Sequence, residues 1–296
     1  MRFVNADGRA GILVGDSVFD VEAVSGGRLP PDPQRLVGAF WDEVLVLAER
    51  GASSGGVDVQ SVRLGPPVPV PPMIMAVVAN FPPAERMPLP MVVGKSPSAV
   101  VGPYDDIVLP DPARLPLGQA FVIPEPELGV VVRGGGRDLG AEEAMSAIAG
   151  FVVAQDVTER RHELGASPPP WTWTNLPAKT LGKSIDTFCP IGPALVTPDE
   201  LDDPARLVER CWVNGRLVFE TSTADLLWSP AELVALLSAF MTLPAGLVCL
   251  CGCDGTVDGS PIPFLAGGDE VRTEIEGIGN MVNTCVAASR SSTGGR

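Results

Sequence analysis

The sequence lacks the usual features of membrane and secreted proteins. It has no run of about 18 apolar residues, the length that a membrane-spanning helix needs. Its first residues, Met1 to Gly8, lack the apolar core of a signal peptide. The six cysteines show no spacing typical of secreted proteins, which favours free thiols in a reducing compartment. These absences predict a cytoplasmic protein that does not associate with a membrane.

Positive charge and histidine are also scarce. The 21 Lys and Arg residues face 36 Asp and Glu residues, which gives a net charge of −15. This balance argues against binding of nucleic acid or of an anionic membrane surface. An anionic substrate would have to be attracted by a local cation. The single histidine, His162, follows two arginines and is more typical of a solvated turn than of a metal ligand.

Glycine and proline, by contrast, are abundant. The chain has 33 Gly and 31 Pro among 296 residues, which suits many short strands and turns. A proline-rich stretch, Leu64–Met73, is typical of an extended connector and marks the best domain boundary. We therefore expect an α+β, mostly β fold. It would comprise a small β-rich N-terminal domain over residues 1–70, a main domain over 71–288 and a disordered tail over 289–296.

Alternation of apolar residues and the placement of turn residues predict the individual elements. In the N-terminal part we expect strands at Arg2–Val4, Gly11–Val14 and Ser17–Val21 and a helix at Pro33–Arg50. Further along we expect strands at Met75–Ala79, Val100–Gly102, Ile107–Leu109, Val248–Gly252 and Glu270–Glu276, helices at Gly140–Ala149 and Ser229–Met241, and a hairpin at Glu209–Glu220.

The most informative motif places two acids two residues apart. Glu125 and Glu127 lie in Phe121–Arg133, a valine-rich segment that predicts a buried strand. Side chains two apart in a strand share a face, so the carboxylates would stand roughly 6–7 Å apart. Burying them is costly unless a cation or a shared proton neutralises them, or unless one points outward at the strand end. Pro126 cannot donate to a sheet ladder, which predicts an edge strand or a bulge there.

A third acid, Asp156, ends the apolar stretch Ala149–Val157, a second strand candidate. Three carboxylates with no nearby His or Cys favour Mg²⁺, Mn²⁺ or Ca²⁺ over Zn²⁺. Cys249, Cys251 and Cys253 alternate along another segment and could form a soft-metal site. Three small buried side chains are the favoured interpretation of that pattern.

Taken in order, these segments resemble the fumarylacetoacetate hydrolase superfamily over nearly the whole chain. The start, MRFVNADGRAGILVGDSVFDV, resembles the small N-terminal domain of bacterial members. The later matching fragments are VVGKSPSAVVGP with Lys95, PEPELGVVV, GFVVAQDVTERR, LGKSIDTFCPIGPALVT with Lys183, VNGRLVFETSTADLLWSPAELVALLSAFMTLPAGLV and FLAGGDEVRTEIEGIGNMVN. Each fragment alone is weak, whereas their common order makes the resemblance specific.

The resemblance implies a catalytic domain of packed, mixed β-sheets, a β-roll or sandwich, usually in a homodimer. It implies Mg²⁺ or Mn²⁺ held by Glu125, Glu127 and Asp156, and small-molecule substrates that are 2-oxo acids or β-dicarbonyl compounds. Two substrate oxygens would chelate the metal, which polarises the carbonyl and stabilises an enolate. Lys183 would place a positive charge beside the substrate, and it could also pair with the ligand acids.

The chain departs from the family pattern after its first main-domain strand. Hydrolase and decarboxylase members carry Asn-Tyr-x-x-His-x-x-Glu there, and the His–Glu pair activates water. Ala84 and Met87 stand at these two positions, and Pro82 and Pro83 disfavour the usual short lid helix beyond its first turn. Glu85 could substitute as a base but is more typical of a solvated loop.

Other departures supply the remaining candidate residues. Glu163 stands where a glutamine is usual, and Asp254 follows Cys253 in a turn that lacks the usual hydroxyls. Trp171 and Trp173 either pack on the core or roof the pocket over an apolar substrate. The candidate catalytic residues are Lys183, Glu163 and Asp254, and the candidate substrate-binding residues are Lys95, Arg160, Trp171, Trp173 and Cys253.

An intact acid set without a water-activating pair favours chemistry that needs only an electron sink. We expect a metal-dependent C–C bond lyase (decarboxylase) or a tautomerase or isomerase ahead of a C–C bond hydrolase, because a general base contributes typically about 10²–10⁴-fold. A hydratase is a third reaction. A non-catalytic metal-binding scaffold is the alternative from another class, although four buried charges argue against it. The altered pocket suggests a bulky, apolar substrate.

Overall fold

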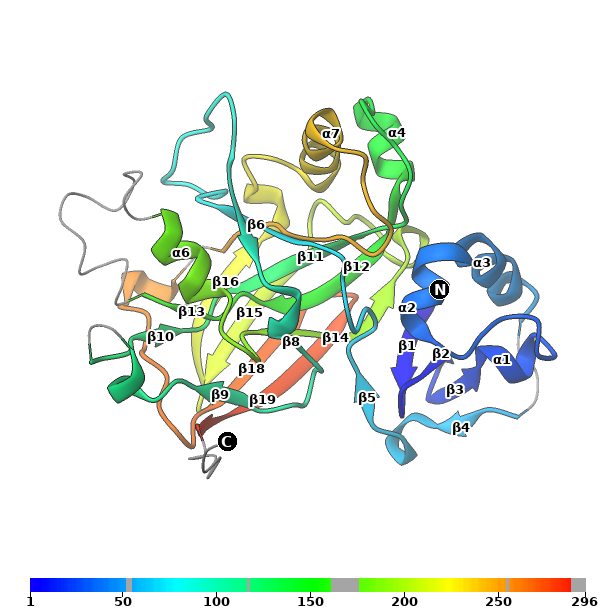
Figure 1. Cartoon of the computed structure of the whole chain (residues 1–296), viewed down its shortest axis with the longest axis horizontal. Helices are drawn as coiled ribbons and strands as arrows, with labels where there is room; N and C mark the ends of the chain where they lie inside the picture. The colour runs from blue at the N-terminus through cyan, green and yellow to red at the C-terminus, as the bar shows by residue number, and fades with distance from the viewer. Residues whose placement is uncertain (52–54, 116–117, 161–175, 254–255, 289–296) are drawn as a thin grey trace, which may run out of the picture.

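The computed structural model describes residues 1–51, 55–115, 118–160, 176–253 and 256–288. Strands occupy its centre, and most helices lie at its periphery (Figure 1). The expected α+β, mostly β fold is confirmed. The α-helices described below are α1 (Val21–Val24), α2 (Pro33–Ala39), α3 (Trp41–Glu49), α4 (Ala141–Ser146), α6 (Leu176–Lys183) and α7 (Pro230–Phe240).

The largest sheet has 12 strands and runs from the N-terminal part through the centre of the molecule. Its main path is β4 (Val57–Asp58), β3 (Ser17–Asp20), β2 (Arg9–Val14), β1 (Arg2–Ala6), β14 (Cys189–Val196), β12 (Ile148–Gln155), β11 (Pro126–Val132), β17 (Val248–Leu250), β6 (Ile74–Val78) and β7 (Met91–Lys95). Two short strands join it from the side: β5 (Leu64–Gly65) pairs with β1, and β8 (Val100–Val101) pairs with β14.

A second sheet of five strands packs against β11, β12 and β14 of the first (Figure 1). Its order is β16 (Arg216–Ser222), β15 (Val208–Val213), β18 (Glu270–Ile275), β19 (Gly279–Ala287) and β9 (Ile107–Leu109). A separate pair joins β10 (Val122–Ile123) to β13 (Thr158–Glu159). The predicted hairpin is confirmed, because β15 and β16 are connected at Asn214-Gly215, where both residues have the positive φ that such a turn requires.

The N-terminal part is bonded directly into the large sheet. Strand β1 pairs with β2 on one side and with β14 on the other, where Phe3 faces Leu195. The domain boundary at residue 70 remains a prediction. The expected continuous helix Pro33–Arg50 is wrong, because Phe40 adopts φ −132° and ψ 19° and divides it into α2 and α3. After this break, the ring of Trp41 packs against the ring of Phe3, with the ring centroids 5.3 Å apart.

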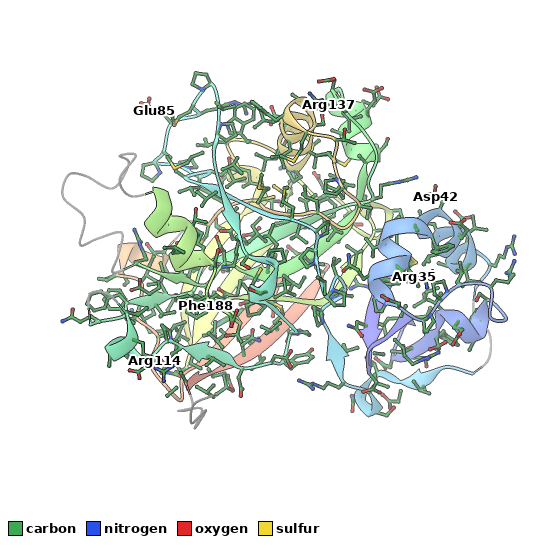
Figure 2. The ribbon with its side chains drawn as sticks, viewed as in Figure 1. Arg35, Asp42, Glu85, Arg114, Arg137 and Phe188 are labelled. Carbon is green, nitrogen blue, oxygen red and sulfur yellow. The ribbon has the colours of Figure 1, made fainter. Side chains whose placement is uncertain are left out.

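The two faces of the large sheet bury different side chains because strand residues alternate. Along β12, Phe151 and Val153 belong to one buried cluster, whereas Val152 and Ala154 belong to another. Helices α4 and α7 contribute to the first cluster, and α2 and α3 contribute to the second. A third cluster surrounds Phe188, which is fully buried among the strands (Figure 2).

Strand β11 differs from its prediction in position. It lies between β12 and β17 and is therefore neither an edge strand nor bulged at its start. Pro126 is its first residue, and pairing with β17 begins only at Gly129, so the missing N–H leaves no gap in a ladder. The sequence patterns also missed α6, β14 and β19. No described helix is long and apolar enough to cross a membrane.

Glu209 is a buried carboxyl group between the two sheets. It lies on β15, which contacts β11, and only 1% of the residue is exposed. Its Oε2 atom has no hydrogen-bond partner among the described residues. Burial raises the pKa of Glu209 to about 8, although the backbone hydrogen bond with Leu128 opposes the shift. The folded protein therefore favours the neutral form of this group.

We expect this buried acid to make stability fall at alkaline pH. A raised pKa in the folded state means that the stabilising contribution is complete below about 4.5 and is lost as the pH rises through about 8. Between pH 6 and pH 9 the wild type should lose on the order of 2–3 kcal/mol more than Glu209→Gln, which imitates the neutral acid. Calorimetry at both pH values measures the difference. Glu270→Gln, at an exposed position of β18, is the matched control, and identical pH profiles for wild type and Glu209→Gln would contradict the assignment.

Candidate metal centre

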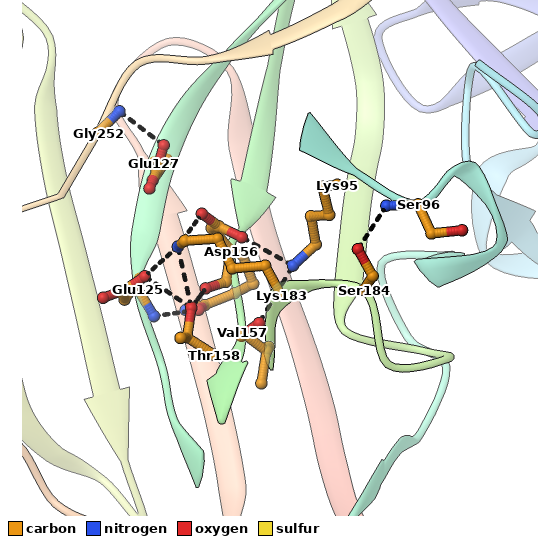
Figure 3. A network of polar contacts seen from close by, with 11 residues as sticks. Lys95, Ser96, Glu125, Glu127, Asp156, Val157, Thr158, Lys183, Ser184 and Gly252 are labelled. Atoms are coloured by element: carbon orange, nitrogen blue, oxygen red, sulfur yellow. Dashed lines mark hydrogen bonds and ion pairs between the residues drawn. The ribbon is translucent and has the colours of Figure 1, made fainter. Parts of the chain in front are cut away.

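Three carboxylates converge where β11 and β12 lie side by side. Glu125 directly precedes β11, Glu127 is its second residue, and Asp156 directly follows β12. Antiparallel pairing of Pro126 with Gln155 brings these positions together. One carboxylate oxygen from each acid lies within 4.8 Å of the others (Figure 3). The structure therefore places both glutamates on one side, as the alternation along the segment predicts.

Local hydrogen bonds explain why the chain holds Glu125 and Asp156 next to each other. The backbone N–H of Asp156 donates to the carbonyl oxygen of Glu125 at 2.8 Å. The N–H of Glu125 donates to Oε1 of Gln155 at 2.9 Å, so the side chain of Gln155 extends the ladder by one residue. The amide nitrogen of Gln155 in turn donates to Oγ1 of Thr273 at 2.6 Å, which ties the site to the second sheet.

Two lysines neutralise part of this acidic charge. Lys183 Nζ lies 2.7 Å from Oε2 of Glu125 and also pairs with Oδ2 of Asp156. Lys95 Nζ lies 2.7 Å from Oδ1 of Asp156 and 3.1 Å from the carbonyl oxygen of Val157. Both lysines are at least 95% buried. The ion-pairing role considered for Lys183 is thus present, and Lys95 supports the same carboxylate from the other side (Figure 3).

Two glycines make this arrangement sterically possible. The N–H of Gly252 donates to Oε2 of Glu127 at 2.6 Å, and a Cβ atom there would come within 2.9 Å of Cβ of Asn80. At Gly182, a Cβ atom would lie 2.3 Å from the carbonyl oxygen of Glu159. Only glycine lets the last turn of α6 approach the strand so closely that Lys183 reaches the acids.

Burial and the neighbouring charges raise the pKa of some groups at this site and lower the pKa of others. Burial, reinforced by the neighbouring Asp156, raises the pKa of Glu127 well above its usual range. For Asp156, burial also favours the neutral form, but Lys183 and Lys95 outweigh it and lower the pKa. Burial disfavours the charged form of Lys183, yet the carboxylates of Asp156, Glu125 and Glu127 raise its pKa. In this arrangement Lys183 carries a positive charge.

This donor set fits a divalent cation with oxygen ligands. When all three acids are ionised, carboxylate oxygens within 4.8 Å of one another concentrate negative charge in a buried place. The raised pKa of Glu127 shows that the pocket does not readily accept this charge. Carboxylate oxygens are the ligands that Mg²⁺ and Mn²⁺ prefer. Glu125, Glu127 and Asp156 are the residues that would hold such an ion.

A small cavity of about 150 Å³ opens onto the acids. Its described lining combines acidic, basic and apolar side chains: Val77, Val78, Ala79, Glu125, Glu127, Thr158, Arg160, Lys179, Lys183 and Cys253. Burial raises the pKa of the Cys253 thiol well above its usual range, so this side chain is a neutral thiol. The described lining therefore offers fixed cations and carboxylates but no thiolate nucleophile.

The predicted candidates divide into three groups by position. Arg160, Lys183 and Cys253 line the cavity together with the glutamates. Lys95 is absent from the described lining and contacts Asp156 instead, so a direct contact with substrate remains a prediction. The residues that lie outside the described part of the chain are His162, Glu163, Trp171, Trp173 and Asp254. Cys249 and Cys251 are free thiols in the buried core, as the favoured interpretation expected.

Sequence reasoning missed two contributors that the structure reveals. The hydroxyl of Thr158 lies 2.8 Å from Oε2 of Glu125 and 3.0 Å from Nζ of Lys183. Lys179 lies one helical turn before Lys183 on α6 and lines the same cavity. A signal was present, because the chain contains no lysines other than Lys95, Lys179 and Lys183, and all three lie at this site.

Comparison with known proteins supports the same relationship. Residues 74–286 match the family model described as fumarylacetoacetate (FAA) hydrolase C-terminal. The chain is 40% identical to the mitochondrial oxaloacetate tautomerase FAHD2B of Bos taurus over 199 residues, which is 67% of this chain and 59% of that protein. The chain thus spans 59% of the length of this curated relative.

Solved structures with the same fold cover almost the whole chain. A Mycobacterium smegmatis protein is 35% identical, with a TM-score of 0.84 over 97% of this chain and 100% of that one. The maleylpyruvate hydrolase of Sphingobium sp. SYK-6 is 28% identical, with a TM-score of 0.77 over 98% of this chain and 100% of that one. The latter was crystallised with a manganese(II) ion and pyruvate.

We expect the acid trio to bind Mn²⁺ or Mg²⁺, and the scarcity of lysine gives a direct readout. Selective [15N]lysine labelling reports on this site alone, because every lysine of the chain is there. Mn²⁺ should broaden the lysine ammonium signals of the wild type. Glu127→Gln should weaken the apparent affinity at least about 10–100-fold, because it removes one charged ligand. Glu49→Gln, at an exposed position of α3, is the matched control, and wild-type signals that stay sharp at millimolar Mn²⁺ would exclude the site.

The buried pair of Lys95 and Asp156 should contribute strongly to folding. Lys95→Met leaves Asp156 without one of its two cations and should reduce the free energy of unfolding by about 3–5 kcal/mol in a metal chelator. Arg133→Met, which breaks the exposed pair with Asp42, should cost at most about 1 kcal/mol. Urea unfolding measures both values. Similar losses in the two variants would show that Lys95 has no special role.

Proposed function

The chain belongs to the fumarylacetoacetate hydrolase family, and on this premise we propose that it is a divalent-metal-dependent tautomerase of 2-oxo acids or β-dicarbonyl compounds. The observation that carries this proposal is the buried set of Glu125, Glu127, Asp156 and Lys183 around one small cavity. A curated relative is named as an oxaloacetate tautomerase, which supports the choice of reaction. Mg²⁺ or Mn²⁺ is the proposed cofactor.

Each residue of the site has a separate role in the proposed enolisation. When bound by the three acids, a divalent cation supplies Lewis acidity toward carbonyl oxygens. Lys183 keeps its proton on Nζ and offers a fixed positive charge to an oxygen that gains negative charge as the enol forms. Lys95 holds Asp156 in place from behind and is therefore a positioning residue. Thr158 orients Glu125 through the contact between its hydroxyl and Oε2.

Proton transfer fits this cavity better than attack by water. A hydrolase needs a group that removes a proton from water, and this contributes typically about 10²–10⁴-fold. At the two positions where the family resemblance would place a water-activating His–Glu pair, the chain has Ala84 and Met87, which cannot ionise. Lys183 is paired with Glu125 and Asp156 as an ammonium group, which disfavours a role as a base. Enolisation also moves a proton, from the α-carbon to the carbonyl oxygen, but polarisation of that carbonyl acidifies the α-carbon, so solvent water can carry the proton between the two atoms. These features support tautomerisation over C–C bond hydrolysis.

Hydrolysis of a C–C bond is the second candidate. The Sphingobium neighbour supports hydrolysis, because it is a maleylpyruvate hydrolase and its structure matches 98% of this chain. In that case a base would come from Glu163 or Asp254, the two predicted catalytic acids that lie outside the described residues. The small cavity volume, about 150 Å³, suits the head group of a 2-oxo acid in either reaction.

Enol–keto exchange provides the decisive test. With Mg²⁺ or Mn²⁺ present, the wild type should accelerate loss of the enol absorbance of oxaloacetate and exchange of its carbon-bound protons with solvent deuterium. Lys183→Met should lower kcat/KM by about 10²–10³-fold, because it removes the fixed charge. Arg35→Met removes a positive charge from the exposed face of α2 and should leave the rate unchanged.

Analysis of the products separates the candidate reactions. A tautomerase leaves the mass of the substrate unchanged, a decarboxylase releases CO₂, and a hydrolase divides an acylpyruvate into two carboxylic acids. Rapid formation of two acids would overturn the proposal in favour of hydrolysis. Equal rates for the wild type and Lys183→Met with several 2-oxo acids would instead support a non-catalytic scaffold.

A further inference from the structure

A second, larger cavity adjoins the acidic cavity at the end of β6. Val78 and Ala79 line both of them. The acidic cavity has a volume of about 150 Å³, whereas the second has about 500 Å³. A substrate could therefore place its carboxylate and carbonyl groups in the acidic cavity. Its remaining atoms would then extend into the second cavity, which is about three times larger. We call this second cavity the tail pocket.

The tail pocket is predominantly apolar. Its apolar lining comes from the loop between β6 and β7, from the first residue of β7 and from the segment before α7, namely Ala84, Met87, Pro90, Met91, Leu227 and Trp228. Met87 is 54% exposed although it is a large apolar side chain. An exposed methionine beside an indole ring provides a surface that an apolar ligand could cover.

The two walls of the tail pocket are fixed to each other by Asn80. Its Nδ2 atom donates to the carbonyl oxygens of Trp228 at 3.0 Å and of Cys251 at 2.7 Å. Its Oδ1 atom accepts the N–H of Trp228 at 2.8 Å, and its carbonyl oxygen accepts the N–H of Leu227 at 2.8 Å. Asn80 is 1% exposed, so these bonds are shielded from water. These bonds therefore fix the Leu227 and Trp228 wall of the pocket to the end of β6.

Backbone strain marks the same junction. Ala79, which lines both cavities, has a φ of +58°, a conformation that residues with a Cβ atom rarely adopt. Strained residues of this kind persist only where surrounding contacts hold them, and they are frequent at binding sites. The four hydrogen bonds of the neighbouring Asn80 provide such contacts.

The charges around the tail pocket oppose a second carboxylate. The guanidinium group of Arg86 lies 4.1 Å above the ring of Trp228, but its Nη2 atom already pairs with Oε1 of Glu232 at 2.8 Å. Glu85 also belongs to the lining and lies on the outer part of the loop after β6 (Figure 2). An anionic tail would meet one acid and a cation that is already paired.

We propose that the tail pocket binds a neutral, apolar substituent, so that the substrate is a monocarboxylic 2-oxo acid or β-dicarbonyl acid with an apolar tail. The inference rests on the proposed function, because the acidic cavity fixes where the head group lies. It adds a selectivity that the acids alone cannot supply. An apolar tail gains from burial against methionine and tryptophan, whereas a charged tail loses its hydration.

A chain-length series tests this selectivity in the full-length protein with Mg²⁺. From acetylpyruvate to hexanoylpyruvate, kcat/KM should rise about fourfold per added methylene group, hence roughly 200-fold over four. Pentanoylpyruvate should be preferred over succinylpyruvate, which has similar length but ends in a carboxylate, by about 10²-fold or more. Calorimetric titration with the same compounds should give the same order of affinities.

A substitution in the lining should change the preference in a defined direction. Met87→Lys places a cation in the tail pocket and should shift the ratio of kcat/KM toward succinylpyruvate by about five- to tenfold. Met145→Lys is the matched control, because Met145 is also exposed but lies on α4 outside both cavities. The control should leave the ratio unchanged.

The outcomes distinguish this inference from the function on which it rests. A flat chain-length profile, or equal ratios for Met87→Lys and Met145→Lys, would overturn the tail pocket while leaving the proposed tautomerase intact. Absence of both turnover and Mg²⁺-dependent binding for every compound would overturn the proposed function, and the tail pocket with it. A rising profile that Met87→Lys alone perturbs would support both.

Discussion

Mutual repulsion among three buried carboxylates is the constraint on which the rest of the site depends. Glu127 and Asp156 are almost fully buried, and neither could remain ionised beside Glu125 without nearby positive charge. The chain supplies that charge from two directions, with Lys95 at the end of β7 and Lys183 at the end of α6. The carboxylate oxygens still lie within 4.8 Å of one another, and this crowding of oxygen ligands is what makes a divalent cation the fitting complement.

Much of this site could be predicted from the sequence because it depends on short-range periodicity. Alternation along one strand brings Glu125 and Glu127 to one side, and a polar residue after an apolar run places Asp156 at a strand end. The remaining contacts depend on distances between elements far apart in the chain. The amide of Gly252 reaches Glu127 across 125 positions, and no pattern within either segment indicates that contact.

The same distinction explains the errors in the fold. Local signals were sufficient for the hairpin at Asn214-Gly215, whose turn residues specify the connection by themselves. They failed at Phe40, where packing of Trp41 on Phe3 favours two helices over one. They also failed at Pro126. Proline is excluded from interior strands only where its missing N–H would have to pair with a neighbouring strand, and the first residue of β11 is not such a position. Both failures lie where the element contacts a segment far away in the chain, Phe3 in one case and β17 in the other.

Chemistry and selectivity are linked in this chain through one loop. Ala84 and Met87 provide no ionisable group, which removes a means of activating water, and the same small and apolar side chains line the larger cavity. On the proposed function, a single departure from the family pattern would therefore disfavour hydrolysis and favour an apolar substrate. Asn80 anchors the start of this loop to Cys251, directly after β17, and to Trp228 before α7. The three acids lie on or next to β11 and β12 and do not belong to this loop.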